Sequence, residues 1–137
     1  MEKGFNIFFG SLATLFVYLL GGWDIALQTL LVVIVLDYIT GVFKAIYNKE
    51  LNSEVGLKGI VKKVGYLIIV ALAVILDRIF GDTGAVRTLV IYFFVANEGL
   101  SILENWGGMG MPIPKVIFDK LEKLKGDDKN GKSDVPK

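Results

Sequence analysis

The segment LLVVIVLDYITGVFKAIYNK, residues 30–49, decides the fold class. It is apolar almost throughout, but it carries one carboxylate, Asp37, near its middle. A helix of about twenty residues spans about 30 Å, which is the thickness of the hydrocarbon core of a bilayer. Burying a charge there is costly unless the group has a partner or reaches water. The segment therefore predicts a membrane-spanning helix with a polar group that needs a partner.

The composition agrees with a membrane protein of a single domain. The 137 residues are 53% hydrophobic, and the mean hydropathy is +0.57. The charged residues are segregated into residues 44–63, residues 77–87 and the region after residue 114, with long apolar stretches between them. A soluble domain intersperses its charges more evenly. Cysteine and histidine are absent, which excludes disulfides, thiol or imidazole catalysis and the usual zinc sites.

Four apolar stretches have about the length of a membrane span, at residues 4–23, 25–46, 64–80 and 85–103. The first could instead be a signal peptide, but little positive charge precedes it and no A-x-A-like cleavage site follows it. The fourth contains charged residues, so an interfacial helix and a total of three spans is the alternative. We expect an all-α integral membrane bundle of four helices, within a transmembrane domain of residues 1–104.

The lysines predict the topology, because cytoplasmic segments of membrane proteins carry an excess of positive charge. Two segments are rich in lysine: Lys44, Lys49, Lys58, Lys62 and Lys63 in the first, and Lys115, Lys120, Lys123, Lys125, Lys129, Lys132 and Lys137 in the second. Both are cytoplasmic only if two spans separate them. With the first span retained, we expect both termini in the cytoplasm.

The C-terminal region is predicted to contain one more helix. Residues 105–125 combine a loop broken by glycine and proline with the segment PKVIFDKLEKLK, whose Ile117, Leu121 and Leu124 share one helical face. Such a cytoplasmic amphipathic helix can lie on an anionic membrane surface or pack against the bundle. Residues 126–137 are polar throughout, and we expect a disordered tail.

Asp37 shares a helical stripe with Thr40, Gly41 and Ala45. Gly41 and Ala45 form a small-xxx-small pattern, which lets two helix backbones approach closely. The stripe should therefore face another helix. Two interpretations stay open: Asp37 has a functional role in a bundle interior or in water, or it only bonds to a neighbouring helix or to Lys44.

The fourth stretch carries a second set of polar groups. Arg87 and Glu98 lie on one face but about 16 Å apart along the helix axis, so each needs a partner elsewhere. Asn97 and Ser101 form a second polar row beside Glu98. A water-lined assembly would satisfy these groups. The predicted helix-seam or pore-facing residues are Asp37, Thr40, Gly41, Ala45, Arg87, Asn97, Glu98 and Ser101.

The sequence contains no enzyme constellation. No nucleophile–base pair, phosphate-binding loop or metal-ligand spacing accompanies the carboxylates, so we expect neither catalysis nor a cofactor or metal. The basic loop lacks interleaved aromatic residues, so nucleic-acid binding has no support.

Two blocks of sequence resemble the toxin secretion/phage lysis holin family. They are LDYITGVFKAIYNKELNSEVGLKGIVKKVGYLIIVALAVILD, residues 36–77, and VANEGLSILENWGGMGMPIPK, residues 95–115. The resemblance covers roughly residues 25–125. It implies a small multi-pass protein of the bacterial cytoplasmic membrane that forms homo-oligomeric lesions in the lipid. Through such lesions an endolysin, or in some relatives a large toxin, leaves the cell.

Two other functions fit the residues alone. A small proton- or ion-coupled transporter could use Asp37 or Glu98 as its titrating group. An accessory subunit could simply bind another membrane protein. A transporter leaves cells intact on expression, whereas a holin kills them abruptly and releases cytoplasmic enzymes.

Overall fold

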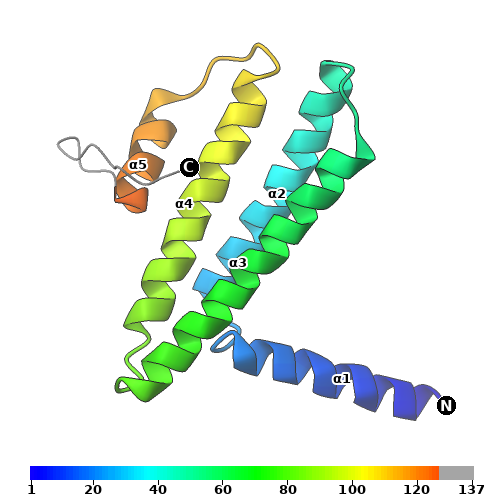
Figure 1. Cartoon of the computed structure of the whole chain (residues 1–137), viewed down its shortest axis with the longest axis vertical. Helices are drawn as coiled ribbons and strands as arrows, with labels where there is room; N and C mark the ends of the chain where they lie inside the picture. Colours follow the sequence, from blue (N-terminus) through cyan, green and yellow to red (C-terminus); the bar gives the residue numbers. More distant parts are fainter. Residues whose placement is uncertain (127–137) are drawn as a thin grey trace.

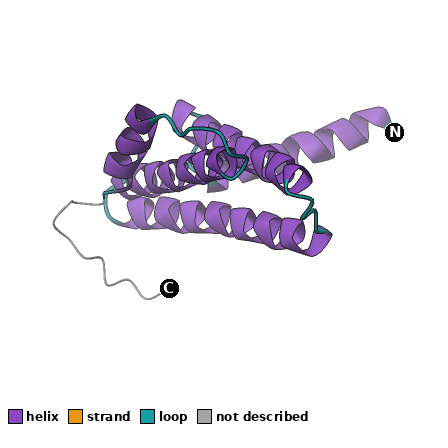
Figure 2. Ribbon diagram, turned by 90° about the horizontal axis from the view of Figure 1, so that it is seen from above, coloured by secondary structure: helices purple, strands orange, loops and turns teal. Residues whose placement is uncertain are grey.

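A computed structural model of the chain describes residues 1–126. Within them the fold is all-α and contains no strand (Figures 1 and 2), which confirms the predicted class. The five helices are α1 (Glu2–Leu19), α2 (Ile25–Tyr47), α3 (Ser53–Ile79), α4 (Ala85–Gly107) and α5 (Lys115–Lys125). The predicted disordered tail lies outside the described residues from residue 127 onward.

Helices α2, α3 and α4 form the bundle, and α4 is its central member, because it packs against α2, α3 and α5. Its N-terminal half meets α2 and α3 in an apolar core. The core residues are Leu20, Leu27, Leu30, Val70, Ile91, Phe94 and Val95. The ring of Tyr66 stacks on that of Phe94 with 4.3 Å between centroids. These contacts fix α3 against α4 at the middle of the bundle.

Side-chain caps define where α2 and α3 begin. The carboxylate of Asp24 accepts a hydrogen bond of 3.0 Å from the Leu27 amide, and the Asn52 side chain accepts one of 2.9 Å from the Glu54 amide. Because α3 already begins at Ser53, it is longer than the predicted span 64–80. Part of the predicted basic loop is therefore helical, and Lys63 lies on a face of α3 that packs in the bundle.

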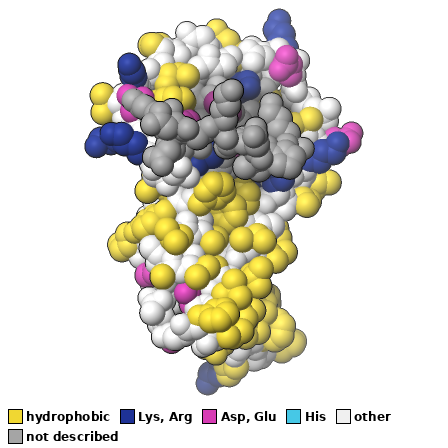
Figure 3. Space-filling model, turned by 60° about the vertical axis from the view of Figure 1, so that its left-hand side comes forward, with side chains coloured by type: hydrophobic (Ala, Val, Ile, Leu, Met, Phe, Trp, Pro, Cys, Tyr) yellow, Lys and Arg dark blue, Asp and Glu magenta, His cyan; other side chains and the backbone are white. Residues whose placement is uncertain are grey.

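Three helices are long and apolar enough to cross a membrane, namely α2, α3 and α4. On the face shown in Figure 3, hydrophobic side chains cover much of the bundle, and most lysine and arginine side chains gather toward one end. The predicted fourth stretch is thus one of the three candidates. The predicted first span is not, so the count of four spans is not confirmed.

Helix α1 projects away from the bundle in Figure 1, and none of its residues is buried. It ends at Leu19 rather than continuing to Trp23, because Gly21 and Gly22 turn the chain with φ angles of +85° and +116°. Arg78 holds its end by donating a 2.9 Å hydrogen bond to the Tyr18 carbonyl oxygen. Its guanidinium also lies 4.2 Å from the centroid of the Tyr18 ring.

Helix α5 folds back beside the C-terminal half of α4 (Figure 1). It begins at Lys115, directly after its N-cap residue, Pro114. Of the predicted apolar face, Leu121 packs against Gly99 of α4, while Ile117 and Leu124 are exposed. Of the two predicted positions for this helix, the structure has the one against the bundle.

Candidate functional site

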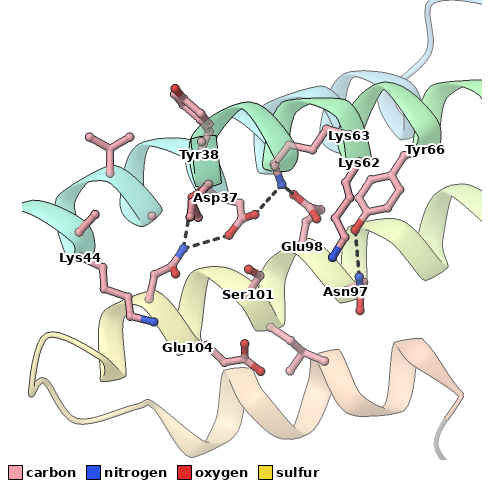
Figure 4. Close-up of a pocket in the computed structure, with 18 of the residues that line it drawn as sticks. Asp37, Tyr38, Lys44, Lys62, Lys63, Tyr66, Asn97, Glu98, Ser101 and Glu104 are labelled. Atoms are coloured by element: carbon pink, nitrogen blue, oxygen red, sulfur yellow. Dashed lines mark hydrogen bonds and ion pairs between the residues drawn. The ribbon is translucent and has the colours of Figure 1, made fainter. Parts of the chain in front are cut away.

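A buried ion network joins the three helices of the bundle (Figure 4). The ammonium of Lys63 on α3 donates a 2.6 Å hydrogen bond to Oδ2 of Asp37 on α2, and a second, short one to Oε2 of Glu98 on α4. The three side chains are only 14%, 10% and 3% exposed, in the order Lys63, Asp37 and Glu98. One ammonium thus serves two carboxylates.

The side chain of Asn105 on α4 donates further hydrogen bonds to Asp37. Its side-chain nitrogen lies 3.0 Å from Oδ1 of Asp37, 3.2 Å from the Asp37 carbonyl oxygen and 3.0 Å from the Thr40 hydroxyl. That hydroxyl donates in turn to the Leu36 carbonyl oxygen at 2.8 Å. A Cβ on Gly41 would lie 3.6 Å from the same Asn105 nitrogen. A methyl group at residue 41 would therefore be in ordinary van der Waals contact with the amide that binds Asp37, and only a larger side chain would crowd it.

A cavity of about 810 Å³ opens beside this network. Charged and polar side chains from all three bundle helices line it together with α5. They include Asp37, Lys44, Lys62, Lys63, Tyr66, Asn97, Glu98, Ser101, Glu104, Asn105, Glu122 and Lys125. Groups of this kind retain water, so the cavity brings a polar environment to the ion network.

The network contains more acidic groups than basic ones. With two carboxylates and one ammonium ionised, its formal charge is −1. Each charge in a membrane interior is expensive, and a buried pair stabilises only when partners satisfy both members. With both carboxylates ionised, an excess negative charge is held between membrane-length helices, at the edge of a polar cavity.

The structure brings most of the predicted site residues together. Those that line the cavity are Asp37, Gly41, Ala45, Asn97, Glu98 and Ser101. Thr40 contacts the network through Asn105, and the Asn97 side chain donates a 3.2 Å hydrogen bond to the Tyr66 hydroxyl. Lys44 does not pair with Asp37; its methylenes pack against Gly108 instead.

Arg87 lies apart from this cavity, at the other end of α4. Its guanidinium pairs with the Asp24 carboxylate at 2.6 Å and donates to the carbonyl oxygens of Leu20 and Gly22 at 2.6 and 3.1 Å. The Asp77 carboxylate accepts hydrogen bonds from the Val86 and Arg87 amides, and so caps α4 where Gly84 has no side chain to do so. The contacts of Arg87 with Asp24, Leu20 and Gly22, which we call the arginine clasp, fix the α1–α2 connection against the bundle.

The clasp predicts a pH dependence of stability. The Arg87 guanidinium bonded to Asp24 holds the pKa of that carboxyl below its ordinary value. Because the pKa is lower in the folded state, the stabilisation is complete above about pH 4 and is lost as the pH falls through the folded-state value. Asp24→Asn keeps a good N-cap but lacks the charge. We expect it to unfold at a lower temperature than the parent at pH 7 in detergent.

The measurement is the difference in unfolding temperature between the two proteins from pH 7 to pH 3. It should shrink below pH 4, because the parent then also loses the charge. A difference that stays constant with pH would show that the ion pair does not contribute.

Lys63, Asn105 and Tyr66 are candidate residues that only the structure identifies. In the sequence, Lys63 follows Lys62, and both lysines indicate topology. The available signal was the N-cap at Asn52, which extends α3 backward and places Lys63 well inside a helix. Within residues 1–126, no cluster of three or more Asp, Glu, His or Cys side chains is placed to hold a metal ion.

Comparison with known proteins assigns the family. Residues 14–126 match the bacteriophage holin family. A probable holin of Bacillus phage phi105 is 40% identical over 101 residues, which cover 74% of this chain and 75% of that protein. An uncharacterised 14.9 kDa protein of Clostridium perfringens is 50% identical over 83% of this chain and 87% of its own length. No solved structure shows significant similarity to the chain. The match extends over most of the chain, and the chain therefore belongs to the bacteriophage holin family.

Proposed function

We propose that this chain is a holin. It oligomerises in the bacterial cytoplasmic membrane and forms lesions through which an endolysin leaves the cell, so that its assembly times host lysis. A large toxin is the alternative cargo. The observation that carries the proposal is the family match over residues 14–126, which includes every residue of the buried ion network.

The ion network gives the proposal a physical basis. A monomer surrounded by lipid must shelter the charges of Asp37, Lys63 and Glu98 from hydrocarbon, and it does so by pairing them inside the bundle. An assembly that admits water to the adjoining cavity lowers the cost of the unpaired negative charge. The network therefore favours a water-lined assembly over an isolated bundle, as a lesion-forming protein requires.

The experiment is induction of the chain in bacteria that also express a reporter endolysin without an export signal. We expect growth to continue while the protein accumulates, and then an abrupt fall in turbidity with release of a cytoplasmic enzyme. Cells with the endolysin alone serve as the control and should stay intact. Continued growth at full membrane abundance of the chain would contradict the proposal.

We further propose four spans with both termini in the cytoplasm. α1 has 18 residues, which cover about 27 Å, and the connection through Leu20 adds enough length to cross a thin hydrocarbon core. Its side chains from Phe5 to Leu19 are largely exposed apolar groups, for which lipid is a suitable environment.

Single cysteines test this topology, because the chain contains none of its own. An impermeant maleimide added to intact cells before lysis should label Thr83→Cys in the α3–α4 connection. It should label neither Ser133→Cys nor Glu2→Cys until the cells are opened. Labelling of Glu2→Cys from outside would show that α1 does not span and that three helices do. Labelling of Ser133→Cys from outside would overturn the orientation itself.

A proton- or ion-coupled transporter is the second candidate, and one observation favours it. Asp37 and Glu98 share a single ammonium beside an open polar cavity, so one of the carboxylates could take up a proton. A transporter of this kind would change the internal pH of intact cells without releasing enzymes. Induction at matched abundance therefore separates the two functions.

A further inference from the structure

Helix α5 is held against α4 at positions where α4 has no side chain. A Cβ on Gly99 would lie 2.8 Å from Cδ2 of Leu121, and one on Gly107 would lie 2.8 Å from Cδ1 of Ile113. Each glycine thus leaves the space that one apolar side chain of the returning segment fills. The Trp106 indole donates a 3.1 Å hydrogen bond to the Pro112 carbonyl oxygen, which ties the connecting turn to α4.

The two glycine contacts also fix the direction of α5. Ile113 contacts Gly107, and Leu121 contacts Gly99. The two contacts are separated by the same number of residues in both segments, and their order shows that α5 runs antiparallel to α4. Residues 96, 99, 103 and 107 follow one another at helical spacing on α4 and form one stripe. Ala96 and Leu103 of this stripe are buried. We call this stripe the α5-binding face.

The arginine clasp marks the opposite end of the bundle and gives the depth of this contact. Gly99 is twelve residues beyond Arg87 on α4, which corresponds to about 18 Å along the helix axis. The hydrocarbon core is about 30 Å thick. If the clasp lies at the outer boundary, as the proposed topology requires, Leu121 meets α4 inside the inner half of the membrane.

The outer surface of α5 is mixed, and its charged residues do not suit lipid at that depth. Its exposed residues include Asp119, Lys120 and Lys123 beside the apolar Val116, Ile117 and Leu124, and its charged residues sum to +2 from four lysines and two acids. Lys123 lies deeper than Leu121, because α5 runs toward the membrane centre. Charged side chains at such a depth normally face protein or water. On its other side, α5 lines the polar cavity with Glu122 and Lys125.

We propose that α5, docked on the α5-binding face, lines the water-filled lesion that copies of this chain form. The docked helix presents charged side chains to the water of the lesion at the depth of the inner leaflet, where an uncovered α4 would present apolar side chains. This inference deepens the proposed holin function and rests on it. It assigns α5 to the wall of the lesion instead of the membrane surface.

The test is a disulfide that locks α5 in place, Gly99→Cys with Leu121→Cys. Cγ of Leu121 lies about where the sulfur of a cysteine at residue 121 would lie. A Cβ at residue 99 would be 3.5 Å from that atom. The second substitution also removes the Cδ atoms that crowd the first. The full chain is placed in vesicles of phosphatidylethanolamine and phosphatidylglycerol that hold a fluorescent dextran. Release is then measured with the pair oxidised and reduced.

We expect the oxidised pair to release dextran within about twofold of the rate of the reduced pair, because the locked position is the one that the lesion uses. Leu121→Asp cannot fill the space at Gly99, and it should slow release at least tenfold. Val116→Asp makes the same change on the same helix at a residue that is 69% exposed, and it should release like the parent. Release that the disulfide blocks and a reductant restores would overturn the proposal, since α5 would then have to leave before a lesion forms.

The yield of the disulfide in the vesicles separates this inference from the holin function. An efficient cross-link places α5 on α4 in lipid whether or not dextran escapes. If the parent releases nothing while the cross-link forms, the proposed function fails, and with it the lesion that α5 would line. If the parent releases dextran but the cross-link does not form, the holin function stands and the placement of α5 is wrong.

Discussion

Lys63→Met is expected to reduce the accumulation of the protein in the membrane at least tenfold. The substitution keeps the length of the side chain but removes the ammonium that Asp37 and Glu98 share. The formal charge of the network then changes from −1 to −2, with two carboxylates close together and no cation between them. Removing one partner of a buried ion pair costs about 3–5 kcal/mol, a large part of the stability of a small domain. Quantitative immunoblotting of membrane fractions at equal synthesis measures the effect.

The neighbouring lysine provides the matched control. Lys62 also lines the cavity, but it is exposed and belongs to no buried ion pair. Lys62→Met removes the same charge from the same turn of α3 and should accumulate like the parent. Adding Asp37→Asn and Glu98→Gln to Lys63→Met makes the network neutral and should restore accumulation. If both lysine variants accumulate equally, the shared ammonium does not hold the bundle together.

Asp37→Asn is expected to delay or abolish lysis while membrane insertion stays intact. The amide keeps the shape of the side chain and can still accept a hydrogen bond from Lys63, but the network becomes neutral. A neutral network costs less in a lipid-surrounded bundle, so the closed state gains stability relative to the water-lined assembly. Insertion scales give about 2.5–3.5 kcal/mol for an aspartate at a helix centre, which corresponds to a shift of roughly a hundredfold in a two-state equilibrium. The measurement is the time of lysis at matched membrane abundance.

Two further variants separate charge from geometry. Glu98→Gln neutralises the network from α4 and should delay lysis as Asp37→Asn does, although it changes a different hydrogen bond. Glu50→Gln removes a carboxylate from an exposed position at the cavity and should lyse on the parental schedule. Lysis of Asp37→Asn on that schedule would leave the residue only a structural, hydrogen-bonding role.

The sequence predicts that the three bundle helices exist, but not where α3 begins, because a long apolar run is a local signal. Long apolar runs determine α2 and α4, and the helical period places Asp37, Gly41 and Ala45 on one face without knowledge of any neighbour. The predicted apolar stretch 4–23 extends beyond Leu19, where α1 ends. Gly21 and Gly22 are visible in the sequence, but the hydrogen bonds that Arg87 donates to the carbonyl oxygens of Leu20 and Gly22 in this turn depend on how α4 packs beside it.

Partners across the bundle could not be predicted in the same way. The need of Asp37 and Glu98 for a cation followed from burial cost, but the choice of Lys63 depends on how α3 rotates against α4. The cap that Asp77 supplies to α4 likewise depends on the turn between two helices. Contacts between helices follow from tertiary packing, which a single sequence does not specify.

If this chain is a holin, it opens the membrane to a folded protein, and the release of a protein from vesicles distinguishes this from the transport of ions. The vesicles carry the full chain in their membrane and enclose both a pH-sensitive dye and a fluorescently labelled, folded endolysin. We predict that the endolysin escapes from the same vesicles in which the pH gradient collapses. Collapse of the gradient while the endolysin stays inside would contradict the account, because it would show a path for protons or ions and none for a protein.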